Sequence, residues 1–143
     1  MRALGLDVGS KTIGIAVSDL MQVTATGVTT LSWDENNMKS ADKALTQYIK
    51  EYEVSSIVIG LPKNMDGSES ERSELSRIYA KRLERLFHIP TTLIDERLTT
   101  VSAERTLLLA DVSRKKRKTV VDKVAAVLIL QTYLDQPKQG GVQ

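Results

Sequence analysis

Residues 4–19, LGLDVGSKTIGIAVSD, contain two short apolar runs separated by a polar turn. The runs at 2–8 and 12–18 are partly β-branched, and Gly9-Ser10-Lys11 lies between them, which is typical of a β-hairpin. One carboxylate, Asp7, interrupts the first run, where a buried strand would place an apolar side chain. Because an unpaired buried charge is costly, Asp7 is a candidate functional residue; a strand-end surface charge is the alternative.

Beyond the hairpin, strand-like and helix-like patterns alternate. Residues 23–33, VTATGVTTLSW, predict a third strand, and residues 55–62, SSIVIGLP, predict a central strand buried on both faces. Between them, apolar residues with helical spacing over 38–52 predict a helix that Asn36 or Asn37 caps.

A second helix is expected after the loop at Pro62–Gly67, and His88-Ile89-Pro90 should end it. Residues 91–96, TTLIDE, predict a fifth strand. The side chains of the second helix that we expect to face inward are Leu75, Ile78, Tyr79, Leu83, Leu86 and Phe87.

The C-terminal part is predicted to hold two further helices. Thr99 or Thr100 is expected to cap the first, which runs through about Ala110, and SRKKRK is expected to be a charged connector. The last helix should cover about 119–134. The whole order, β-β-β-α-β-α-β-α-α, predicts an α/β fold in which helices cover a mixed sheet. We expect one domain over residues 1–137 and a flexible tail over 138–143.

The amino-acid composition excludes some kinds of functional site but does not identify the activity. The 143 residues are 41% hydrophobic and 27% charged, with a net charge of +2, so any basic surface must be local. There are no cysteines, which excludes disulfides, thiolate zinc sites and a cysteine nucleophile. No signal segment and no membrane-spanning run is evident, and we expect a cytoplasmic protein without membrane contact.

Four acidic residues lie where a site would form. Asp7, the pair Asp95 and Glu96, and Asp122 fall near the carboxyl ends of the first and fifth strands and in the first turn of the last helix. If the two strands are parallel, these carboxylates converge at one sheet edge. A cluster of hard oxygen ligands suits Mg²⁺ or Mn²⁺, and two such ions about 4 Å apart can assist phosphodiester cleavage. Helix capping and surface charge are the alternative roles.

Four segments together resemble the YqgF/RuvX family, in the same order and over nearly the whole chain. They are GLDVGSKTIGIAVSD, IVIGLPKNMDGS, DERLTTVSAE and KTVVDKVAAVLILQTYL. The resemblance implies a ribonuclease-H-like fold with a five-stranded mixed sheet in the order 3-2-1-4-5, flanked by helices. It also implies that Asp7, Glu96 and Asp122 are catalytic metal ligands. Asp95 is the backup, because side chains alternate along a strand and only one of the pair should face the site.

Basic and polar residues near these acids are candidate substrate contacts, with surface charge or turn chemistry as the alternative. They are Lys11, Lys63, Asn64, Arg97, Arg114, Lys115, Lys116, Arg117 and Lys118. Aromatic residues are only 4% of the chain, which favours recognition of shape and backbone over base stacking.

The family resemblance implies a nuclease that acts on structured nucleic acid, as a monomer or homodimer. Maturation of the 5′ end of pre-16S ribosomal RNA is the leading function, and Holliday-junction resolution is the alternative. Two functions of other classes remain open: a non-catalytic RNA- or ribosome-binding module, and an ATPase or kinase related to actin. The last would need a second domain to close over nucleotide, for which the chain has no room.

Overall fold

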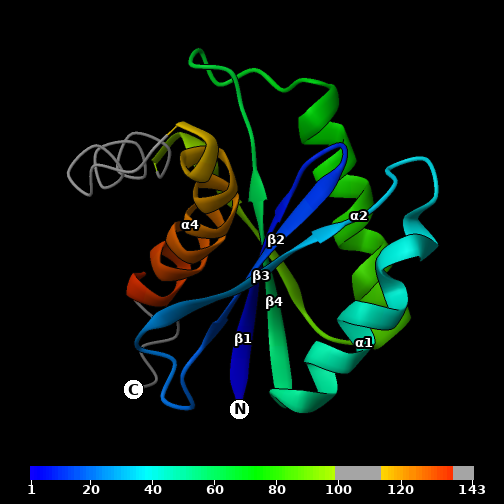
Figure 1. The fold of residues 1–143 in the computed structure, drawn as a ribbon, viewed down its shortest axis with the longest axis vertical. Coiled ribbons are helices and arrows are strands. Elements are labelled where there is room, and N and C mark those ends of the chain that lie inside the picture. The colour runs from blue at the N-terminus through cyan, green and yellow to red at the C-terminus, as the bar shows by residue number, and fades with distance from the viewer. Residues whose placement is uncertain (99–113, 137–143) are drawn as a thin grey trace.

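The computed structural model describes residues 1–98 and 114–136, and for residues 98 and 114–123 it describes the backbone alone. A five-stranded mixed sheet in the order β3-β2-β1-β4-β5 forms its centre (Figure 1). The β1–β2 and β2–β3 pairs are antiparallel, whereas β1–β4 and β4–β5 are parallel. The predicted hairpin and strand order are confirmed. The strands are β1 (Arg2–Val8), β2 (Thr12–Ser18), β3 (Ala25–Ser32), β4 (Val54–Leu61) and β5 (Thr91–Asp95).

Helices cover both faces of this sheet. On one face lie α1 (Asp42–Glu51), which follows the short 3-10 helix η1 (Met38–Ala41), and α2 (Glu71–Phe87). On the other face lies α4 (Arg114–Asp135), as Figure 1 shows. A second short 3-10 helix, η2 (Glu96–Leu98), follows β5 directly. No helix among the described residues is long and apolar enough to cross a bilayer.

The alternation of strand side chains produces two separate cores. The core under α1 and α2 is built from large side chains such as Leu6, Ile59 and Leu83. The core under α4 contains smaller residues of the sheet, Ala3 and Ala16, packed against Ile129 and Leu130. At Gly5 a Cβ atom would lie 2.7 Å from the Cβ of Leu130, so the helix approaches the sheet too closely for any side chain there.

The second helix ends where the sequence predicts, but two of its side chains do not face inward. His88 adopts the left-handed conformation (φ 56°) and ends α2. Ile78 and Leu86 are 49% and 44% exposed, because they lie beside the buried stripe of α2 instead of on it. The stripe includes two buried serines, Ser73 and Ser76, which hydrophobic spacing cannot identify.

The structure changes two predictions about helix starts. Asn37 is the N-cap residue of η1, where the helical stretch begins at Met38, but it makes no side-chain capping bond, and the N-cap residue of α1 itself is Ala41. The basic run from Arg114 belongs to α4 and is not a connector, because lysine and arginine are good helix formers. The expected helix from Thr99 or Thr100 lies outside the described residues.

Candidate active site

Asp7 and Glu96 come together at the carboxyl ends of the parallel strands. Asp7 is the penultimate residue of β1 and pairs with Gly14 of β2. Glu96 begins η2 immediately after β5. The two carboxyl groups form a hydrogen bond with each other, although β4 lies between their strands. Strands that are not neighbours in the sheet therefore contribute to one site.

Gly60 of β4 explains how Glu96 reaches across the intervening strand. Gly60 pairs with Ile94, and a Cβ atom at Gly60 would lie 2.9 Å from both Cγ and Cδ of Glu96. It would also lie 2.4 Å from Cδ1 of Ile129 in α4. The space that the missing side chain leaves is thus filled by Glu96 and α4. A glycine inside a strand often marks a close approach of another segment. Gly60 in the predicted central strand is therefore the feature of the sequence that could have indicated this contact.

The environment of Glu96 strongly favours its protonated form. Burial, the negative charge of Asp7 and the hydrogen bond to Asp7 raise the pKa of Glu96 to about 8, while the positive charge of Arg72 opposes the shift. Near neutral pH the pair therefore holds a proton between its carboxyl groups. A divalent cation can take the place of that proton, since it neutralises both carboxylates.

Asp95, the backup ligand, is engaged elsewhere. Its carboxylate receives hydrogen bonds from Arg97, with Nη2 2.7 Å and Nε 3.0 Å from Oδ2. These bonds lower the pKa of Asp95 and keep it ionised. Asp95 is the last residue of β5 and pairs with Arg97, whereas Glu96, the first residue of η2, meets Asp7.

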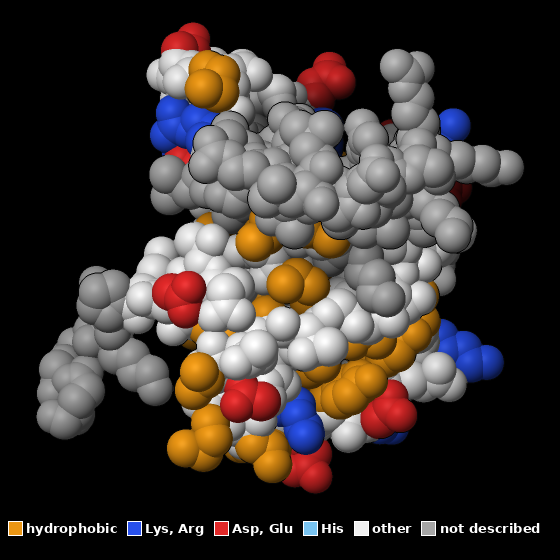
Figure 2. All heavy atoms as spheres, turned by 60° about the vertical axis from the view of Figure 1, so that its left-hand side comes forward, with side chains coloured by type: hydrophobic (Ala, Val, Ile, Leu, Met, Phe, Trp, Pro, Cys, Tyr) orange, Lys and Arg blue, Asp and Glu red, His pale blue; other side chains and the backbone are white. Residues whose placement is uncertain are grey.

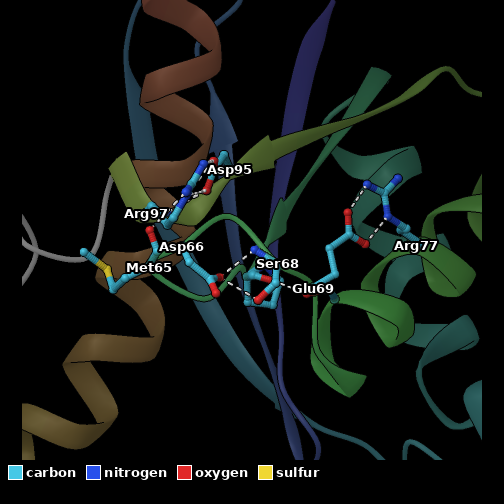
Figure 3. Close-up of polar contacts among 9 residues, drawn as sticks. Met65, Asp66, Ser68, Glu69, Arg77, Asp95 and Arg97 are labelled. Atoms are coloured by element: carbon cyan, nitrogen blue, oxygen red, sulfur yellow. Dashed lines mark hydrogen bonds and ion pairs between the residues drawn. The ribbon is translucent and has the colours of Figure 1, made fainter.

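The loop between β4 and α2 is held in place by polar contacts (Figure 3). Nη1 of Arg97 donates to the carbonyl of Met65 at 3.4 Å, and Oδ1 of Asp66 accepts from the amide and hydroxyl of Ser68 at 2.8 and 2.6 Å. Asn64 donates to the Ser68 hydroxyl at 2.9 Å. Asp66 and the side-chain NH₂ group of Asn64 thus stabilise the turn. This is the turn role that we considered as the alternative to substrate contact.

The remaining predicted substrate contacts lie in the β1–β2 turn, in the β4–α2 loop and at the start of α4. Lys11 is exposed in the β1–β2 turn, and its backbone carbonyl accepts from the amide of Trp33 at 3.0 Å. Lys63 lies in the β4–α2 loop, and its positive charge helps to lower the pKa of Asp95. The five basic residues from Arg114 to Lys118 occupy the first turns of α4, and their side chains lie outside the described residues.

Asp122 lies farther along α4 than predicted. Because α4 begins at Arg114, Asp122 is about two turns inside the helix and not in its first turn. It precedes the buried Ala126 by about one turn. The capping role weighed for Asp122 is therefore excluded, although its side chain lies outside the described residues.

Arg72 is a residue near the site that sequence patterns did not reveal. It lies in the first turn of α2, and its Nη2 is 3.5 Å from the carbonyl oxygen of Val8, the residue after Asp7. No local pattern marks an exposed helix arginine as a neighbour of a distant strand end.

The structure describes the side chains of two of the three expected metal ligands, Asp7 and Glu96. Among those residues, no group of three acidic or histidine side chains is close enough to hold a metal ion. The paired carboxyl groups of Asp7 and Glu96 nevertheless suit Mg²⁺ or Mn²⁺, which prefer oxygen ligands, and they need a cation when both are ionised.

Comparison with known proteins agrees with this fold. Over residues 1–136 the sequence matches the RuvX family, described as Holliday junction resolvase. A protein of Oceanobacillus iheyensis named "Putative pre-16S rRNA nuclease" is 60% identical over 136 residues, which cover 95% of this chain and 99% of that protein.

Two solved structures share the fold at low sequence identity. Thermus thermophilus RuvC in complex with a Holliday junction superimposes with a TM-score of 0.57 at 9% identity, covering 94% of this chain and 96% of that one. The fowlpox virus resolvase with Holliday junction DNA has a TM-score of 0.55 at 14% identity, covering 94% and 97%. These structures support the ribonuclease-H-like fold that the family resemblance implied. From the match to residues 1–136 and the 60% identical relative, this chain belongs to the RuvX family.

Proposed function

We propose that this protein is a divalent-metal-dependent endonuclease that cuts phosphodiester bonds in structured nucleic acid, with precursor 16S ribosomal RNA in the cytoplasm as its leading substrate. The observation that carries the proposal is the hydrogen-bonded pair of Asp7 and Glu96, which meets over Gly60 at the carboxyl edge of the sheet. A stable fold gains nothing from two half-buried carboxyl groups in contact, so the pair points to a cation.

Asp7, Glu96 and Asp122 would hold Mg²⁺ or Mn²⁺. When bound, such ions activate a water molecule and stabilise the leaving oxygen of a phosphodiester. The position of Asp122 supports its inclusion, because an α-helix repeats every 3.6 residues and residue 122 therefore shares a side of α4 with Ala126 and Ile129, which pack on the sheet.

The described part of the surface on the α4 side carries no concentrated group of basic side chains. Figure 2 shows the α4 side of the molecule, where the described lysine and arginine side chains are scattered among acidic ones. Large exposed apolar residues of the described part include Leu20, Met21 and Val23, in the turn between β2 and β3. That turn lies at the opposite end of the sheet from Asp7, because β2 is antiparallel to β1.

Holliday-junction resolution is the second candidate. It is favoured by the description of the family and by the likeness to RuvC bound to a junction. Processing of precursor RNA is favoured by the name of the 60% identical relative. Both reactions use the same carboxylates, so only the substrate distinguishes them.

The test is cleavage of two substrates in parallel: a precursor RNA that carries the 5′ end of 16S ribosomal RNA, and a four-way DNA junction. Wild-type protein should cut at least one in Mg²⁺ or Mn²⁺ and neither in chelator. Asp7→Asn should reduce the rate at least about 100-fold while the circular dichroism spectrum stays unchanged.

A matched control is Asp19→Asn, because Asp19 is an exposed carboxylate at the opposite end of the hairpin, where it accepts hydrogen bonds from the amides of Val23 and Thr24. Its cleavage rate should equal that of the wild type. Binding of RNA without metal-dependent cleavage would instead establish the non-catalytic module.

A further inference from the structure

Arg72 reaches the candidate active site from the side of the sheet opposite to α4. It lies in the first turn of α2, yet its Nη2 atom contacts the carbonyl oxygen of Val8 at the carboxyl end of β1. At 3.5 Å this contact is at the outer limit of a hydrogen bond, and Val8 is the one hydrogen-bond partner of Arg72 among the described residues. The described residues thus leave most of the five guanidinium donors without a partner.

The charge of Arg72 acts on the carboxyl pair. Of the groups that influence Glu96, Asp7 and Asp95 raise its pKa, whereas Arg72 lowers it. The guanidinium thus lies close enough to affect the charge of Glu96. Three other arginines differ, because each is neutralised by an acid: Arg77 by Glu69, Arg82 by Asp42 and Arg97 by Asp95.

Helix stability does not account for an arginine at this position. The first turn of a helix carries partial positive charge, which favours acidic residues such as Glu71 and Glu74 and disfavours a cation. The capping box of Ser70 and Ser73 already satisfies the helix end. The exposed side chain of Arg72 also buries little surface.

We propose that Arg72 binds a phosphate group of the nucleic-acid substrate beside the Asp7–Glu96 pair, opposite α4. This inference rests on the proposed nuclease function and adds a residue to it. A guanidinium presents paired donors that match two phosphate oxygens, and it stays charged at every working pH. The substrate backbone would then cross the sheet edge between the first turn of α2 and the α4 side. The contact is to the backbone, so it does not depend on base sequence.

The test compares Arg72→Ala, Arg72→Lys and the matched control Arg85→Ala. Arg85 is exposed on the same helix, about 20 Å along its axis from Arg72, so its removal changes the net charge equally. Binding of the precursor RNA and of the DNA junction is measured against salt concentration in an Asp7→Asn background, which prevents cleavage. Values of kcat/KM are measured in the otherwise wild-type protein, and melting temperatures are recorded for all variants.

Arg72→Ala should lower the salt dependence of log Kd by about one counterion and reduce kcat/KM by about 10- to 100-fold, with an unchanged or higher melting temperature. Arg72→Lys should keep the salt dependence and recover part of kcat/KM. Arg85→Ala should match the wild type.

Values for Arg72→Ala that equal those of Arg85→Ala would overturn the inference while leaving the nuclease function intact. A loss of activity that accompanies a lower melting temperature and an unchanged salt dependence would also overturn it, since the role would then be structural. Failure of the wild type to cut or bind either substrate would instead refute the proposed function, and the role of Arg72 with it.

Discussion

The two faces of the sheet carry apolar side chains of different size. Under α1 and α2 the strands present large apolar residues, and the helix α2 adds Tyr79 and Leu83, both completely buried. Under α4 the strands present alanine and glycine beside Val58 and Ile94, and at Gly5 and Gly60 the helix lies almost on the backbone. The first arrangement stabilises the fold through buried area. The second leaves room for Glu96 to cross β4 and meet Asp7.

This comparison assigns stability mainly to the face under α1 and α2, and activity mainly to the face under α4. Changes under α1 and α2 should alter how much protein is folded without altering the chemistry of the folded molecules. Changes under α4 near Gly60 should alter the chemistry first. The following variants test that separation.

The largest effect is expected from Leu83→Ala in α2. Leu83 is completely buried, so the variant should lose about 2–5 kcal/mol of unfolding free energy in urea denaturation. Cleavage per folded molecule should stay at the wild-type rate. Leu86→Ala on the same helix is the control, because Leu86 is 44% exposed and the change should cost less than about 1 kcal/mol. Equal losses in both variants would contradict the assignment of the buried face.

A smaller and more selective effect is expected from the two glycines under α4. In Gly5→Ala the new methyl group meets the Cβ of Leu130 at 2.7 Å, so α4 must move, which should cost about 1–3 kcal/mol. In Gly60→Ala the nearest atoms are ends of flexible side chains, among them Glu96. This variant should lose less stability but more activity, since Glu96 is displaced. Wild-type cleavage by Gly60→Ala would contradict the crossing of β4 by Glu96.

The sequence predicted local structure well because its signals are local. The hairpin at 2–8 and 12–18 has the bounds that alternating apolar residues and the Gly9-Ser10-Lys11 turn predict. Helical spacing also predicted correctly that the side chains of Tyr79 and Leu83 face inward. The predicted inward orientation of Ile78 and Leu86 was wrong. Periodicity identifies an apolar stripe on a helix, but it does not show how much of that stripe the sheet covers.

The meeting of Asp7 and Glu96 could not be derived from residue patterns alone. It depends on the strand order, which is set by contacts between distant segments, and the resemblance to a family supplied that order. Patterns likewise gave no reason to join Arg72 of α2 to the end of β1. The start of α4 was missed because a run of lysine and arginine has no apolar period, although these residues favour helices.

The central claim is that Asp7 and Glu96 hold a divalent cation in place of the proton they share. The most direct measurement is calorimetric titration of Mn²⁺ into the wild type, Asp7→Asn and Glu96→Gln, in two buffers of different ionisation enthalpy. The pKa of Glu96 is raised to about 8, so at pH 7 Glu96 is mostly protonated and binding should release a proton. Affinity should therefore rise with pH, by at most about tenfold per unit, and level off above about pH 8. Both variants should lose most of the binding. Equal Mn²⁺ affinity in the wild type and Asp7→Asn, or binding that releases no proton at pH 7, would contradict the account.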